Sequence, residues 1–136
     1  MFNNIIVPID LTHTERADAM IKAAKHMGGP DAKITVINVF DEIPGYVAAE
    51  LPADTIENSK KMARDRLQEV VTSMDLKAEA VIRSGQPARC ILDLAEDNDA
   101  DLIIIASHKP GLQDYLLGST AARVVRHAKC PVLVLR

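Results

Sequence analysis

Short apolar runs alternate with segments of helical periodicity along this chain, and this alternation constrains its fold more than any other feature. Each apolar run is rich in Ile, Val and Leu, as expected for a strand buried on both faces. Strands that alternate with helices predict an α/β fold: an open parallel sheet, helices on both of its faces and right-handed crossovers. We expect strands over residues 4–9, 33–40, 78–83, 102–106 and 132–135.

The segments between these strands carry helical patterns. Thr12 and Thr14 are candidate caps for the first helix, and Gly28-Gly29-Pro30 follows its last apolar residue. Pro87 fits the first position of a later helix. Residues 41–54 contain Pro44, Gly45 and Pro52 and form a long connection. We expect helices up to residue 27 and over residues 55–74, 87–98 and 119–128.

Composition narrows the class of protein. The chain has 136 residues, which suits a single domain over residues 1–136. The formal net charge is −3 and there is no Trp, so neither a basic patch nor base stacking favours a nucleic-acid partner. The longest apolar run, residues 102–106, is too short to cross a membrane, and residues 1–8 lack a secretory signal. We therefore expect a cytoplasmic protein with no membrane and no nucleic-acid partner.

The two cysteines, Cys90 and Cys130, are interpreted as reduced structural residues. Neither has a CxxC spacing or a histidine at zinc-ligand spacing. No residue of the chain is assigned to a metal site on this basis.

The last third of the chain is predicted to place a polar loop and a new helix N-terminus at the carboxyl end of a strand. Ser107-His108-Lys109 directly follows the fourth strand, and Gly118-Ser119-Thr120 opens the last helix. Backbone N–H groups and the helix dipole make such a helix start suitable for phosphate. The alternative is an ordinary helix start with Ser119 as the N-cap and a solvated loop before it.

Asp10 follows the first strand, where ligands of open α/β sheets usually bind. Its carboxylate could accept hydrogen bonds from a ribose or an adenine, or help to hold a metal. An Asx turn or a helix cap is an equally good interpretation. The chain contains neither GxxxxGK[ST] nor GxGxxG, so a P-loop NTPase and a dinucleotide-binding Rossmann domain both lose their main support.

Three segments together resemble the universal stress protein family. These are Ile-Ile-Val-Pro-Ile-Asp at residues 5–10, Asp-Leu-Ile-Ile-Ile-Ala-Ser-His-Lys-Pro at residues 101–110, and residues 116–135. Ala-Ser-His followed by a basic residue and Pro is most similar to the small bacterial F/G-type branch. The resemblance implies a Rossmann-like sheet in the order 3-2-1-4-5. It also implies a homodimer through the last strand, formed by Val132, Leu133, Val134 and Leu135.

Many members of the family bind ATP through a motif of Gly, two residues, Gly, nine residues, and Gly followed by Ser or Thr. Gly118-Ser119 matches the end of this motif, whereas Ala106 and Lys109 stand at the first two glycines, and the loop is one residue shorter. The resemblance implies ATP as the ligand, with AMP and ADP as further candidates and Mg²⁺ as a companion ion.

The resemblance also assigns site residues by position. Pro8, Ile9 and Asp10 would line the adenosine side, and Val39 would touch the adenine. Ile105, Ala106 and Ser107 would continue the pocket wall. The residues that would approach the phosphates are His108, Lys109, Gly118, Ser119 and Thr120.

Three functions remain open at this point. The leading one is an ATP-binding stress-response protein that regulates as a homodimer. A slow ATPase or phosphotransferase is the second, although no catalytic base or preorganised metal site is evident, and no residue is assigned as catalytic. The third is a family member that binds no nucleotide and acts through dimerisation alone.

Overall fold

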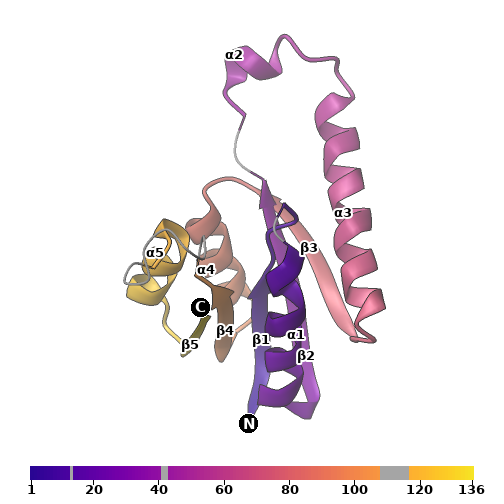
Figure 1. Ribbon diagram of the computed structural model, residues 1–136. Helices are drawn as coiled ribbons and strands as arrows, with labels where there is room; N and C mark the ends of the chain where they lie inside the picture. The colour runs from indigo at the N-terminus through magenta and orange to yellow at the C-terminus, as the bar shows by residue number, and fades with distance from the viewer. Residues whose placement is uncertain (13, 41–42, 108–116) are drawn as a thin grey trace.

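The chain folds around one five-stranded parallel sheet in the order β3-β2-β1-β4-β5 (Figure 1). The computed structural model describes residues 1–12, 14–40, 43–107 and 117–136. The predicted fold class and strand order are confirmed. The strands are β1 (Phe2–Pro8), β2 (Gly28–Phe40), β3 (Ala78–Ser84), β4 (Leu102–Ala106) and β5 (Val132–Leu135).

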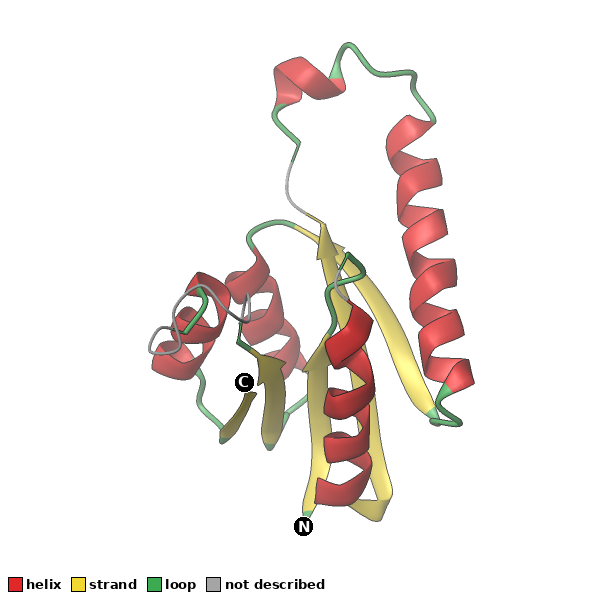
Figure 2. Ribbon diagram, viewed as in Figure 1, coloured by secondary structure: helices red, strands yellow, loops and turns green. Residues whose placement is uncertain are grey.

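Helices cover both faces of the sheet (Figure 2). The 3-10 turn η1 leads into the first helix, and the short helix α2 lies in the connection that was predicted to be long. Among the described residues, no helix combines the length and the apolar character that a membrane span requires. The helical elements are η1 (Thr14–Arg16), α1 (Ala17–Met27), α2 (Gly45–Ala48), α3 (Thr55–Ser73), α4 (Pro87–Asp97) and α5 (Ser119–His127).

Two separate hydrophobic clusters hold these helices on the sheet. Ile5 and Val7 of β1 point to the face covered by α1 and α3, whereas Ile6 points to the face covered by α4 and α5. All three side chains are essentially buried. A strand that is buried on both faces needs a continuous apolar run, because successive side chains point to opposite faces.

The sheet order creates a switch point between β1 and β4. β1 pairs with β2 on one side, over Asn4–Pro8 against Lys33–Ile37, and with β4 on the other, where Ile5 and Ile6 face Leu102 and Ile103. The chain therefore leaves the carboxyl ends of β1 and β4 in opposite directions. In open α/β sheets this divergence leaves a crevice in which ligands bind.

The second strand begins earlier than the sequence predicts. α1 ends at Met27 as expected, but Gly28 is already extended and pairs with Phe2 of β1. A side chain at Gly28 would lie 2.8 Å from the Cβ of Ala32, so the close packing of this bend requires glycine. The two glycines therefore continue into the sheet instead of forming a loop.

The predicted cap of the first helix is wrong. Arg16 occupies the N-cap position of α1 and no side chain caps it, while Thr14 begins the preceding 3-10 turn. The hydroxyl of Thr12 donates to Asp10 instead. Pro87, by contrast, begins α4 as predicted, and the side chain of Gln86 accepts a hydrogen bond from the Arg89 N–H at 2.7 Å.

Candidate functional site

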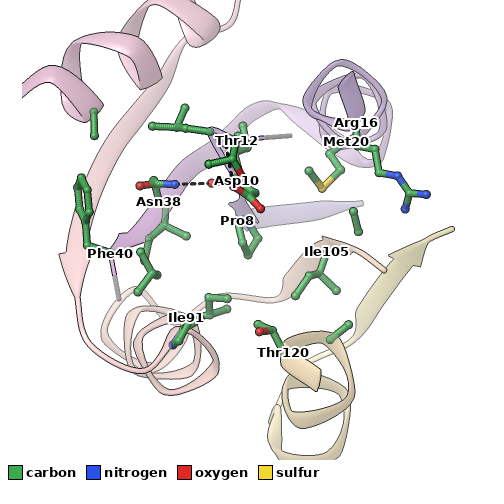
Figure 3. Close-up of a pocket in the computed structure, with 18 of the residues that line it drawn as sticks. Pro8, Asp10, Thr12, Arg16, Met20, Asn38, Phe40, Ile91, Ile105 and Thr120 are labelled. Carbon is green, nitrogen blue, oxygen red and sulfur yellow. Dashed lines mark hydrogen bonds between the residues drawn. The ribbon is translucent and has the colours of Figure 1, made fainter. Parts of the chain in front are cut away.

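A cavity of about 1010 Å³ opens at the carboxyl edge of the sheet (Figure 3). The ends of β1, β2 and β4 form its floor, and η1, α1, α3, α4 and α5 contribute its walls. Its size is at the upper end of the range for small-molecule sites, roughly 300–1,000 Å³. It lies at the switch point described above.

Most of the predicted site residues share this cavity. Gly118 does not line it but immediately precedes Ser119, which does. His108 and Lys109 lie outside the described residues. The predicted residues that line the cavity are Pro8, Ile9, Asp10, Val39, Ile105, Ala106, Ser107, Ser119 and Thr120.

The segment that follows β1 is held against β2 by two hydrogen bonds. The Ile9 N–H donates to the Ile37 carbonyl at 2.8 Å, and the Ile9 carbonyl accepts from the Asn38 side-chain amide at 2.9 Å. Ile9 and Asn38 are both buried. Sequence reasoning missed Asn38, although an amide inside a buried apolar run must have a partner and so signals a fixed contact.

Asp10 forms an Asx turn, which was one of the interpretations of this residue from the sequence. Its Oδ1 accepts from the Thr12 N–H at 2.9 Å and from the Thr12 hydroxyl at 2.6 Å. The turn does not withdraw Asp10 from the site, because its exposed side chain still lines the cavity. The turn instead holds the carboxylate in one orientation at the end of β1.

The end of β4 is fixed from two directions at Ser107. The Ser107 N–H donates to the Leu135 carbonyl of β5 at 2.8 Å. The Ser107 carbonyl accepts from Nη1 of Arg16 at 2.6 Å, across 91 residues of sequence. Ser107 itself is buried, at 9% exposure.

The start of α5 differs by one residue from the alternative in which Ser119 is the N-cap. Gly118 occupies the N-cap position, no side chain caps the helix, and Ser119 is its first helical residue. The Ala122 N–H is the first to donate within the helix, to the Gly118 carbonyl. The N–H groups of Ser119, Thr120 and Ala121 therefore have no acceptor in the helix, and all three residues line the cavity.

Two arginines of the cavity wall were not predicted. Arg16 contacts the end of β4, as described, and Nη2 of Arg66 on α3 donates to the Leu11 carbonyl at 3.2 Å. No local pattern distinguishes them from other surface arginines, because their place depends on how α1 and α3 pack. The other lining residues that the sequence analysis did not assign to the site are Leu11, Thr12, Glu15, Met20, Ile37, Phe40, Ser59, Met62, Ala63, Pro87, Ile91 and Ala121.

The described residues show no cluster of three or more His, Cys, Asp or Glu side chains that could hold a metal ion. Two groups with shifted pKa values lie outside the cavity lining. The hydrogen bond that Lys129 donates to Glu96, followed by the negative charge of Glu96, raises the pKa of Lys129. Burial, followed by the negative charge of Asp101, raises the pKa of Cys130.

Comparison with known proteins identifies the family. The family model described as "Universal stress protein family" matches residues 1–136. The chain belongs to this family. It is 32% identical to Universal stress protein G of Escherichia coli O157:H7 over 145 aligned positions, which cover all of both chains. It is 30% identical to Universal stress protein MJ0531 of Methanocaldococcus jannaschii, covering all of this chain and 83% of that one.

Solved structures have the same fold. The hypothetical protein MJ0577 superposes with a TM-score of 0.82 at 26% identity, covering 99% of this chain and 96% of that one. UspA of Lactobacillus plantarum superposes with a TM-score of 0.67 at 30% identity, covering 98% and 97%. Two more distant family structures, with TM-scores of 0.65 and 0.66 at 19% and 20% identity, are complexes with dAMP and with cAMP; the former is from Archaeoglobus fulgidus.

Proposed function

We propose that the cavity binds an adenine nucleotide, with ATP as the principal ligand, and that the protein regulates a stress response through its nucleotide-bound state. The main support for the proposal is that one cavity, at the switch point between β1 and β4, contains both apolar walls and the N-terminus of α5. Family structures solved with dAMP and cAMP support the same ligand class. We assign binding to the cavity and assign no residue as catalytic.

The cavity has two chemically different regions. Val39, Ile105 and Ile91 supply apolar surface, suited to the faces of a purine base. Asp10, oriented by its turn with Thr12, is suited to accept from ribose hydroxyls. The uncapped N–H groups of α5 and the hydroxyls of Ser119 and Thr120 are suited to phosphate oxygens.

Mg²⁺ is compatible with this arrangement when it binds through the nucleotide. Mg²⁺ sites commonly use one or two carboxylates together with substrate phosphates and water, and do not require a cage made of protein side chains alone. Asp10 and Glu15 are the described carboxylates in the cavity wall. When bound, the ion would supply positive charge to the phosphates.

We also propose that the protein is a homodimer formed through β5. β5 pairs with β4 and with no other strand among the described residues, so one of its edges is open. All four of its side chains are half-buried within one chain. An apolar edge strand of this kind favours pairing with a second copy.

Titration calorimetry with Mg-ATP tests the nucleotide proposal. Heat that saturates at one nucleotide per chain is the expected result. Gly118→Val should weaken binding about tenfold or more, because it places a branched side chain at the start of α5, beside Ser119. Gly118 has φ −58° and ψ 156°, which any residue adopts, so a loss would reflect bulk and not backbone strain. An absence of heat at high protein concentration would contradict the proposal.

A further inference from the structure

Arg16 connects the start of α1 with the end of β4 in the cavity wall. It stands at the N-cap position of α1, on one face of the sheet, and reaches the end of β4. α5 begins on the other face. Figure 3 shows Arg16 and Thr120 on opposite sides of the cavity, with Ile105 of β4 between them. A group lying over the end of β4 would therefore have the N-terminus of α5 on one side and Arg16 on the other.

The hydrogen bond from Arg16 offsets the partial negative charge of the Ser107 carbonyl at the end of β4. A carbonyl at the end of a strand presents partial negative charge, which repels a phosphate. The Arg16 guanidinium donates one hydrogen bond to this carbonyl at 2.6 Å. A guanidinium has five N–H donors in a fixed fork, so the others remain to be used. The bond holds the cation in place while leaving donors for a ligand.

Arg16 is one of two positively charged side chains in the described lining of the cavity. The charged side chains of the described lining are Asp10, Glu15, Arg16 and Arg66, two negative and two positive. Loss of either arginine leaves the lining net negative. The two arginines differ in their contacts, however, because Arg66 reaches from α3 to the Leu11 carbonyl after β1, whereas Arg16 reaches the Ser107 carbonyl after β4.

We propose that Arg16 is a phosphate-binding residue of the nucleotide site, and that it makes the site favour nucleotides over nucleosides. This inference rests on the proposed nucleotide function. It adds Arg16 to the residues that the resemblance places near the phosphates. Arg66 has the same charge but donates from α3 to the Leu11 carbonyl, so it would contribute less to phosphate affinity than Arg16.

Equilibrium dialysis with adenosine, AMP and ATP tests the proposal on the full chain and on Arg16→Gln, Arg16→Lys and Arg66→Gln. Arg16→Gln should weaken ATP binding about 10- to 100-fold, as expected for a lost hydrogen-bonded charge. Adenosine affinity should change less than about threefold, because the nucleoside carries no charge. Arg16→Lys should recover part of the loss, and the salt dependence of ATP binding should be weaker in Arg16→Gln than in the wild type.

Arg66→Gln is the matched control, because it removes the same charge from the same cavity. It should lose less ATP affinity than Arg16→Gln, because Arg66 donates to the Leu11 carbonyl and not to the carbonyl at the end of β4. Equal losses of ATP affinity in Arg66→Gln and Arg16→Gln would overturn the proposal, because they would show that only the total charge of the cavity lining matters. Equal losses of adenosine and ATP in Arg16→Gln would show that Arg16 only maintains the structure, and would also overturn it.

Two further outcomes separate this inference from the proposed function. A wild-type protein that binds adenosine and ATP, with an Arg16→Gln variant that binds both normally, would overturn the role of Arg16 alone. A wild-type protein that binds neither would overturn both. If Arg16→Gln does not fold, adenosine, AMP and ATP binding to Arg16→Lys tests the role of Arg16 instead. Lysine keeps the positive charge but lacks the forked N–H donors of the guanidinium. A lysine variant with unchanged ATP affinity and unchanged salt dependence would then contradict a hydrogen-bonded phosphate contact.

Discussion

Asn38 is the buried amide that joins the ends of β1 and β2 at the floor of the cavity. It is 9% exposed, and its Nδ2 donates to the Ile9 carbonyl. We expect Asn38→Ala to lower the free energy of unfolding by about 1–3 kcal/mol, because the Ile9 carbonyl loses its side-chain partner. Asn38→Asp should cost more at neutral pH, because it replaces the donor with a charged acceptor facing that carbonyl. Urea unfolding followed by circular dichroism measures both.

Asn58→Ala is the control for Asn38, because Asn58 is an exposed residue of α3. Its stability should stay within about 0.5 kcal/mol of the wild type. If Asn38→Ala behaved in the same way, the contact with Ile9 would not contribute to stability.

Cys130 should be a slowly reacting thiol in the folded protein. Burial, and then the negative charge of Asp101, raise its pKa above the ordinary value, so less thiolate is present at neutral pH. The measurement uses a Cys90→Ser background and follows the rate of alkylation by iodoacetamide as the pH rises. The pH midpoint of this rate should be higher in the folded protein than in the same protein unfolded in urea. A midpoint equal to that of the unfolded protein would contradict this environment.

At the level of elements, β5 has one paired side and one open side. The Ile103 N–H donates to the Pro131 carbonyl and the Ser107 N–H to the Leu135 carbonyl. Backbone groups of successive strand residues point to opposite sides, so Leu133 faces β4, whereas Val132 and Val134 present their N–H and C=O groups to the open edge. This alternation makes the proposed dimer testable with single prolines.

Val134→Pro should abolish the dimer and leave the monomer folded, because it removes an N–H from the open edge, where proline is tolerated. Leu133→Pro should instead destabilise the chain by about 3 kcal/mol or more, because it removes an N–H from the side paired with β4. Sedimentation velocity and thermal unfolding separate the two effects. A dimer that persists in Val134→Pro would place the interface elsewhere.

At the scale of the molecule, the cavity joins elements from both faces of the sheet. Residues of α1 and α3 and residues of α4 and α5 all contribute to its wall. A ligand that binds only this assembled state stabilises the whole fold. Mg-ATP at 100 times its dissociation constant should therefore raise the free energy of unfolding by about 2.7 kcal/mol.

Thermal unfolding monitored by circular dichroism measures this effect as a rise of several degrees in the midpoint. Gly118→Val should show a much smaller rise at the same ATP concentration. An equal rise in Gly118→Val and the wild type would mean that ATP stabilises the chain without using the start of α5.

The sequence by itself determined the alternation of strands and helices, the parallel sheet and the family of this protein. β4 and β5 begin and end at the predicted residues, because apolar runs bounded by polar residues allow little choice of register. The order 3-2-1-4-5, implied by the resemblance, is confirmed, and most of the predicted cavity residues lie together because parallel strands end at one edge.

The tertiary structure alone decided the contacts that cross the fold. Gly28 enters the sheet because Phe2 lies beside it, and Thr12 turns to Asp10 instead of capping α1. Arg16 reaches Ser107 across 91 residues, a pairing that no local pattern encodes. Helix and strand patterns arise from neighbours a few residues apart, whereas the charge in the cavity depends on how separate helices pack on one sheet.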